Sequence, residues 1–163
     1  MKNLYRGIIF TALVLTGCDT RTPVMSEEDI ALVKEIYPTI NDACVERARY
    51  EGASAINVSV DICFPMQSAR PWTGLWVNEF EGSRFCPSPR SDCDQPEFGE
   101  GIWLSFAEGE RPEAAHPYGD GTIYKVQFLG RRTKEPDSFG HYGYFAHEIV
   151  VDELISMETY TVP

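Results

Sequence analysis

Residues 124–132 read YKVQFLGRR, and this stretch indicates the class of fold. Tyr, Val and Phe alternate in it with Lys and Gln. A period of two places the apolar side chains on one face of a β-strand and the polar side chains on the other. Asp120 and Gly121 stand just before it and are a good signal for a turn. The stretch therefore predicts a strand with one buried face.

The same kind of alternation predicts four further strands, and glycine or proline interrupts the chain in each gap between strands. These strands are expected at residues 56–62, 75–80, 102–106 and 149–157. The last segment can also be read as a helix, but its Val and Ile content favours a strand.

Five short alternating strands predict a mainly β (α+β) fold, either a small antiparallel barrel or a sandwich. Over residues 72–160 their order resembles an OB-like barrel: a long strand, a hairpin, the stretch YKVQFLGRR, a loop and a closing strand. The resemblance implies a five-stranded barrel.

Two helices are expected before the strands. Ser26 can cap the first helix, and the three acidic residues that follow suit the positive end of its dipole. Pro38 ends this helix. Thr39 or Asn41 caps the second helix, and Gly52 ends it.

The N-terminus has the features of an export signal. Lys2 and Arg6 precede an apolar run at residues 7–15, which is too short to span a bilayer. The run ends in LTGC, residues 15–18, which resembles the lipobox of bacterial lipoproteins. In that family the cysteine is acylated and becomes the first residue of the mature chain, so the resemblance implies a lipid anchor on Cys18. The alternative is an ordinary signal peptide with a chance cysteine.

The resemblance also implies a location. The protein would be anchored by lipid to a membrane of the cell envelope, with its domain in the periplasm or outside the cell. Asp19 follows the cysteine, and in enteric bacteria an acidic residue there directs retention in the inner membrane. The expected segments are a signal peptide of residues 1–17, a tether of 18–25, a helical segment of 26–52 packed on the domain, and a β-rich domain of 53–163.

Four cysteines remain, Cys44, Cys63, Cys86 and Cys93. An even number in an exported chain suggests disulfides, for which three pairings are possible. We favour Cys86–Cys93, because CPSPRSDC is a short loop rich in Pro and Ser that a disulfide can close at its base. Cys44–Cys63 then follows. The alternative is a site with four metal ligands, but the sequence has no C-x-x-C pair.

The formal net charge is −11, and loss of Lys2 and Arg6 with the signal makes it more negative. Such a surface repels nucleic-acid backbones and anionic lipid headgroups, so nucleic acid is not an expected partner. A basic envelope protein or a glycan is the expected kind of partner. The alternative is an acidic surface that only keeps the domain soluble.

The sequence has no nucleotide-binding, hydrolase or metalloprotease motif, and so gives no positive reason to expect an enzyme, a cofactor or a metal. A triad assembled in space would leave no such motif. In the stretch FGHYGYFAHE, residues 139–148, His141, His147 and Glu148 could ligate a metal or form an acid–base pair. The alternative is a glycine-rich turn with a solvent-facing histidine.

The acidic stretch DCDQPEFGEG, residues 92–101, offers oxygen ligands at alternate positions, which suit calcium. Its spacing lacks the regular loop of such sites, so a solvated acidic loop is favoured.

Aromatic residues form the third candidate group: Trp72, Trp76, Trp103, Tyr118, Tyr142 and Tyr144. Exposed aromatic rings can stack on sugars or hold a peptide, whereas core packing is the alternative role. Trp72 and Tyr142 are expected to be exposed, because each lies near Pro or Gly in a predicted loop. The candidate ligand-binding residues are Trp72, His141, Tyr142 and His147.

The function that these observations favour is that of a membrane-anchored envelope lipoprotein, a non-enzymatic binding or scaffolding protein that acts through contact with another protein. The alternative is a small envelope enzyme or a glycan-binding protein that uses the loop histidines and aromatic residues.

Overall fold

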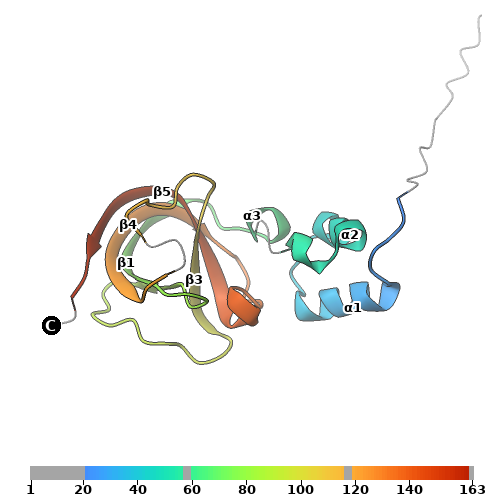
Figure 1. The fold of residues 1–163 in the computed structure, drawn as a ribbon, viewed down its shortest axis with the longest axis horizontal. Coiled ribbons are helices and arrows are strands. Elements are labelled where there is room, and N and C mark those ends of the chain that lie inside the picture. Colours follow the sequence, from blue (N-terminus) through green and yellow to red (C-terminus); the bar gives the residue numbers. More distant parts are fainter. Residues whose placement is uncertain (1–20, 57–59, 116–118, 162–163) are drawn as a thin grey trace, which may run out of the picture.

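The structure is a computed structural model that describes residues 21–56, 60–115 and 119–161. The predicted signal peptide, the lipidation site Cys18, Asp19 and Tyr118 lie outside these ranges. The elements in chain order (Figure 1) are α1 (Glu27–Ile36), α2 (Asp42–Glu51), η1 (Ala53–Ile56), α3 (Val60–Cys63), β1 (Arg70–Asn78), β2 (Arg84–Pro87), β3 (Glu100–Phe106), β4 (Thr122–Arg132), η2 (His141–Gly143) and β5 (Phe145–Thr159). In the described part of the chain, no helix has both the length and the apolar character needed to cross a membrane.

The strands close into a barrel in the order β1-β2-β3-β5-β4, and β4 returns to β1. This confirms the prediction of a mainly β fold with a small OB-like barrel. Four of the pairings are antiparallel, but β3 and β5 run parallel, so the expectation of a wholly antiparallel barrel is wrong at this pair. Parallel neighbours need a long crossover, and here the crossover contains β4.

Strand β4 has the alternation that the sequence indicates. Tyr124, Val126 and Phe128 are buried, whereas Lys125 and Gln127 are exposed. The strand pairs with β1 on one side and β5 on the other, so its buried face can only point into the barrel. Strand β4 therefore contributes the central residues of the barrel core.

The segment 56–62 was expected to be a strand, and this is wrong. Ile56 ends the short helix η1, and Val60–Cys63 is helix α3. The reason is tertiary. Ile56 and Cys63 are buried in a core of the helices, and Cys63 is bonded to Cys44 of α2. These contacts hold Ile56 and α3 against α2.

The remaining strand is β2, which overlaps the stretch that the sequence assigned to a loop. It is four residues long, too short to display a period of two. It pairs with β1 along its length and with β3 at one position, Arg84 opposite Trp103. Gly74 of β1 allows the close approach, because a Cβ there would lie 2.2 Å from the carbonyl oxygen of Cys86.

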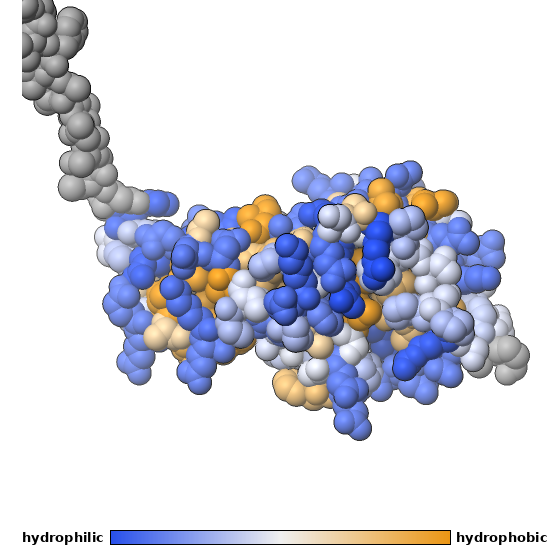
Figure 2. All heavy atoms as spheres, turned by 180° about the vertical axis from the view of Figure 1, so that it is seen from behind, coloured by the Kyte–Doolittle hydropathy of each residue, from blue (hydrophilic) through white to orange (hydrophobic). Residues whose placement is uncertain are grey.

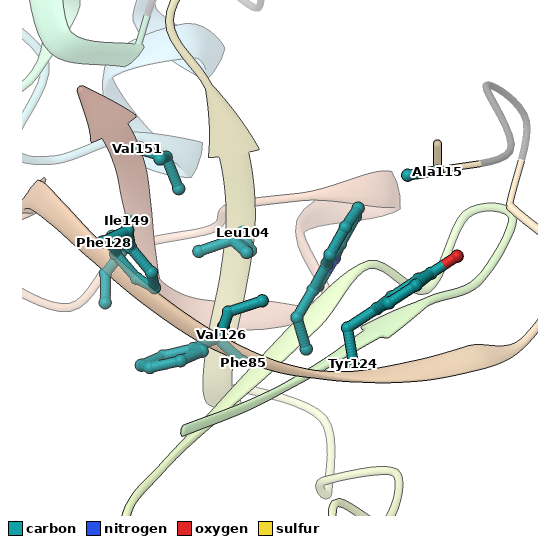
Figure 3. Packing of buried hydrophobic residues seen from close by; sticks show 9 residues of the cluster. Phe85, Leu104, Ala115, Tyr124, Val126, Phe128, Ile149 and Val151 are labelled. Carbon is teal, nitrogen blue, oxygen red and sulfur yellow. The ribbon is translucent and has the colours of Figure 1, made fainter. Parts of the chain in front are cut away.

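The barrel core draws side chains from all five strands toward one centre (Figure 3). Trp76 lies fully buried in it and stacks on Tyr124, with ring centroids 5.3 Å apart. Its indole Nε1 donates to Ser83 Oγ at 3.0 Å, and that hydroxyl donates to the Leu104 carbonyl at 2.8 Å. The polar atom of the largest core residue is therefore satisfied, as burial requires.

The helices α1, α2, η1 and α3, here called the helical layer, form a second small core beside the barrel (Figure 1). The predicted caps are present. Ser26 forms a capping box with Asp29, and Asn41 Oδ1 accepts from the amide of Cys44 at 2.9 Å. Phe139, from the barrel side, packs into this core. The two cores therefore meet at the segment before η2.

Polar contacts at Thr39 and at Asp61 join the helical layer to the barrel. The amide and hydroxyl of Thr39 both donate to Asp137 Oδ2, at 3.1 and 2.6 Å. Arg131 of β4 donates to Asp61 of α3 at 3.1 Å. Partly buried contacts of this kind fix the orientation of the layers more than they add stability.

Both predicted disulfides are present. Cys44–Cys63 joins α2 to α3 across 19 positions in sequence, and Cys86–Cys93 closes a loop of separation 7. Because a disulfide restricts the unfolded chain more when it closes a longer loop, the first should contribute more to stability.

We expect the double substitution Cys44→Ser with Cys63→Ser to lower the free energy of unfolding by about 3 kcal/mol. Cys86→Ser with Cys93→Ser should cost about 1 kcal/mol less, because its loop is shorter. Urea unfolding followed by circular dichroism measures both. An equal or larger loss from the second pair would contradict this ranking.

Candidate binding site

A groove of about 600 Å³ lies where the end of α1 meets η2 and the loop before β3. Figure 1 shows η2, in orange, between the barrel and α1. We call it the aromatic groove; its lining residues are Ile36, Tyr37, Phe98, Ser138, Gly140, His141, Tyr142 and Gly143. The groove therefore contains two of the residues that the sequence singled out, His141 and Tyr142.

The loop of η2 holds Tyr142 out into solvent. Tyr142 has a left-handed backbone, with φ of 52°, and its side chain is 89% exposed. Phe139 and Phe145 exchange two backbone hydrogen bonds, of 2.9 and 3.0 Å, that close the loop. A left-handed conformation in a non-glycine residue costs about 1 kcal/mol or more, and such strain concentrates at functional sites.

The His141 side chain packs against Tyr142 in this loop. Its Nε2 lies 3.3 Å from Glu81 Oε2, but the atom is buried and has no hydrogen-bond partner in the described residues. The His141 and Tyr142 ring centroids are 4.0 Å apart. Glu81, like Tyr142, has a positive φ. The histidine thus acts in the structure as a packing support for the exposed tyrosine.

Phe98 forms the opposite wall and was not singled out by the sequence. It is 72% exposed, and its ring centroid is 5.6 Å from that of Tyr144. The Tyr144 hydroxyl donates to the Pro96 carbonyl at 2.9 Å, and the Gly99 amide donates to the Tyr144 carbonyl at 2.9 Å. These bonds tie the Phe98 loop to η2. The one feature of the sequence that could have identified Phe98 is its position as a single aromatic residue within the acidic stretch 92–101.

A second pocket, of about 280 Å³, adjoins the aromatic groove, and the two share Tyr37, Ser138 and Gly140. It lies between the helical layer and the outer face of the parallel pair β3–β5. We call it the carboxyl pocket; its lining residues are Tyr37, Ile56, Val60, Phe64, Trp103, Ser105, Ser138, Phe139, Gly140 and Glu148. The walls are thus mainly aromatic and aliphatic, and Glu148 is their one carboxylate.

The carboxyl group of Glu148 sits in an environment that disfavours its charge. Burial raises its pKa to about 7, and the negative charge of Asp61 adds to this, while the hydrogen bond from Ser105 opposes it. Ser105 Oγ donates to Glu148 Oε1 at 2.6 Å. No cation pairs with Glu148 among the residues described. The other oxygen, Oε2, also has no hydrogen-bond partner there.

The nearby cation, Arg131, is already paired with other carboxylates. Arg131 Nε contacts both oxygens of Asp152 at 3.0 Å, and its Nη2 lies 2.7 Å from Asp152 Oδ1 and 3.1 Å from Asp61 Oδ2. The two carboxylates raise the pKa of Arg131 further above its ordinary value. Two negative charges thus face one guanidinium, which leaves Glu148 without compensation.

The structure separates the other predicted ligand-binding residues from this site. Trp72 was expected in an exposed loop, and this is wrong: it lies in β1, packs against the barrel core and donates to the Gly130 carbonyl at 3.1 Å. The Arg70 guanidinium covers its ring at 3.8 Å. Strand β1 begins at Arg70, five residues before the predicted start at residue 75, and this brings Trp72 into the sheet.

His147 lies on β5, half-buried, with Nδ1 3.1 Å from Thr133 Oγ1. Burial lowers its pKa, and the charge of Arg132 acts in the same direction. His141 and His147 therefore contact different residues, Glu81 and Thr133, and do not form one pair. Trp103 and Tyr144 lie beside the groove and pocket, whereas Trp76 is a core residue.

A larger cavity of about 640 Å³ lies between β2, β3 and the loop of residues 89–97. Its charged residues are of both signs, and Arg84 is already paired with Glu79 and with the Cys93 carbonyl. The acidic stretch 92–101 borders it. Within the described ranges, no group of three or more His, Cys, Asp or Glu side chains is placed to hold a metal ion.

We expect Glu148→Gln to remove a pH dependence of stability. The folded pKa of about 7 exceeds the ordinary 4.5, so the folded chain holds the proton more tightly, and stability falls as pH rises from about 4.5 through 7. The substitution should raise the free energy of unfolding at pH 8 by about 1–3 kcal/mol. At pH 4 it should leave the free energy of unfolding almost unchanged. Urea unfolding at both pH values measures this.

Glu153→Gln is the matched control, because Glu153 is an exposed carboxylate on the same strand. It should change neither value by more than about 0.5 kcal/mol. If Glu148→Gln and Glu153→Gln gave the same pH profile, the raised pKa of Glu148 would be refuted.

Comparison with known proteins gives no further assignment of this site. No protein-family model, no curated protein and no solved structure matches the chain. The function is therefore argued from the groove, the pocket and the charge of the chain.

Proposed function

We propose that this protein is a lipid-anchored, non-enzymatic binding protein of the bacterial cell envelope, which acts by contact with another protein. One observation carries the proposal: three exposed apolar side chains line the same groove. Ile36, Phe98 and Tyr142 are 44%, 72% and 89% exposed. Large apolar side chains gathered in one place on a protein surface are typical of interaction sites.

The surroundings of the groove support this reading. Figure 2 shows one face of the molecule, which is mainly hydrophilic and on which apolar residues form small patches. Covering Phe98 or Tyr142 would contribute about 2 kcal/mol each, enough for a partner to depend on them. Both side chains stand on loops tied by hydrogen bonds, so little conformational entropy is lost when they are covered.

The charge of the chain favours a basic partner. The net charge is −11, while the described lining of the groove contains no Lys, Arg, Asp or Glu. Long-range attraction would therefore speed the approach of a positively charged protein, and aromatic contact would hold it.

The proposed anchor limits where the partner can be. The amides of Val24 and Met25 both donate to the Arg49 carbonyl, at 2.8 and 3.1 Å, which attaches the chain to the end of α2. Cys18 lies six residues before Val24, a stretch that spans at most about 20 Å. A lipid on Cys18 would therefore keep the helical layer close to the membrane, and the partner would be a membrane protein or a protein near its surface.

A glycan is the second candidate ligand, because the exposed faces of Tyr142 and Phe98 suit stacking on sugar rings. The enzymatic alternative has less support, because His141 and His147 contact different residues.

A photo-cross-linking residue in place of Tyr142 tests the proposal in native membranes, with the same residue in place of Ile155 as the control. Ile155 is also an exposed apolar residue, at 59%, but does not line the groove. We expect a recurrent protein adduct from position 142 alone, and its loss in a Cys18→Ala chain.

The captured protein, once purified, should bind the Phe98→Ala chain about 30-fold more weakly and should bind the Ile155→Ala chain with unchanged affinity. Equal adducts from both positions, or equal affinities of both variants, would refute the groove as the contact surface. Glycan adducts alone would favour the second candidate.

A further inference from the structure

The carboxyl pocket has a chemistry that the proposed function does not use. Its walls carry the rings of Tyr37, Phe64, Trp103 and Phe139, while Glu148 and Ser105 supply the polar atoms. It adjoins the aromatic groove through Tyr37, Ser138 and Gly140, so a side chain of a molecule seated in the groove can reach it.

We propose that the carboxyl pocket binds the alkylammonium group of a lysine side chain from the protein partner, with the ammonium on Glu148 Oε2 and the methylene stem between the aromatic walls. The inference rests on the proposed function, because it assigns the partner's anchor residue.

The charge around the pocket selects a cation. Asp61 and Asp152 share the single guanidinium of Arg131, and ionised Glu148 adds a third carboxylate. The local charge is therefore negative by two units once Glu148 ionises, so an anion would be repelled and a cation attracted.

The walls suit both parts of a lysine side chain. Aromatic rings attract a cation through their faces, and aliphatic side chains such as Ile56 and Val60 suit a methylene stem. Phe64 is held at an angle to both Tyr37 and Phe139, with centroids 5.9 and 4.9 Å apart, so these rings form a corner of the wall. A volume of about 280 Å³ accommodates one long side chain.

The hydrogen bond from Ser105 favours lysine over arginine. A guanidinium binds a carboxylate best when it takes both oxygens, and Ser105 already occupies one of the two acceptor positions of Glu148 Oε1, at 2.6 Å. The free oxygen Oε2 fits a compact ammonium. The Ser105 oxygen can accept a second hydrogen bond from the same group.

Binding should be linked to pH, because the ammonium needs an ionised carboxylate. Glu148 loses its proton near pH 7, so affinity should rise about tenfold between pH 6 and pH 8. Tyr37 is the other titratable group that lines the pocket, and the charge of Asp137 acts on it. The charge of Asp61 on α3 acts on Glu148, and Arg131 of β4 pairs with both Asp61 and Asp152 of β5. Burial and the charge of Asp137 raise the pKa of Tyr37, which keeps it neutral at these pH values.

Titration of the purified protein with Nα-acetyl-lysine methyl ester, followed by NMR at pH 6 and pH 8, tests the inference. We expect the ester to bind, with affinity rising about tenfold over this interval. The Glu148→Gln chain should lose binding at both pH values and keep its fold. The norleucine ester, which lacks the charge, should not bind.

Other outcomes would overturn the inference. Equal binding of the norleucine ester would mean an apolar pocket, and tighter binding of the arginine ester would exclude the selection of lysine. Tighter binding of the free diamine cadaverine would point to a small amine and not to a protein side chain. Retained binding by Glu148→Gln would exclude the carboxylate as the contact.

The two proposals can fail separately. If the captured partner depends on Phe98 but binds the Glu148→Gln chain with unchanged affinity, the proposed function stands and the lysine site is refuted. If no protein partner depends on Phe98 while the lysine ester still binds, the pocket is an amine site without the proposed protein contact, and its assignment to a partner's lysine is refuted.

Discussion

The parallel pairing of β3 with β5 closes the barrel and also builds the wall of the candidate site. It sets Trp103 opposite Glu148 in register and brings Ser105 within 2.6 Å of that carboxylate. Leu104 and Ile149 of the same two strands point inward and are buried in the core. Because side chains alternate along a strand, the residues between them must face outward, toward the helical layer. Core and site thus depend on one register.

The helical layer turns this outer face into a pocket. Thr39 is held on Asp137, and Asp61 on Arg131, so two separate positions of the layer are attached to the barrel. Phe139 packs into the helical core from the barrel side. The pocket lies between two small cores, so its width depends on the position of one core relative to the other. The Cys44–Cys63 disulfide limits that freedom on the helical side.

Glu148 is costly to keep. A carboxyl group with its charge disfavoured by burial destabilises the folded state as pH rises, and no cation among the described residues compensates it. Tyr142 and Glu81 add left-handed backbone nearby. Features that lower stability and lie together at one surface are the pattern of a functional site, because stability alone would favour their replacement. These destabilising features lie at the groove and the pocket, and they are the reason to favour this site over the larger cavity beside β2.

Local patterns in the sequence were enough to predict β4, the two capped helices and both disulfides. The alternation of β4 and the side-chain caps of the helices are patterns of a few neighbouring residues. The disulfides could be predicted because four cysteines allow only three pairings. The tertiary structure alone decided that Ile56 and residues 60–62 lie in helices and not in a strand, that a four-residue stretch becomes β2, and that β3 and β5 run parallel. It also raised the pKa of Glu148 and gathered Phe98 with Tyr142 in one groove. These features depend on contacts between residues far apart in the chain, which no local period records.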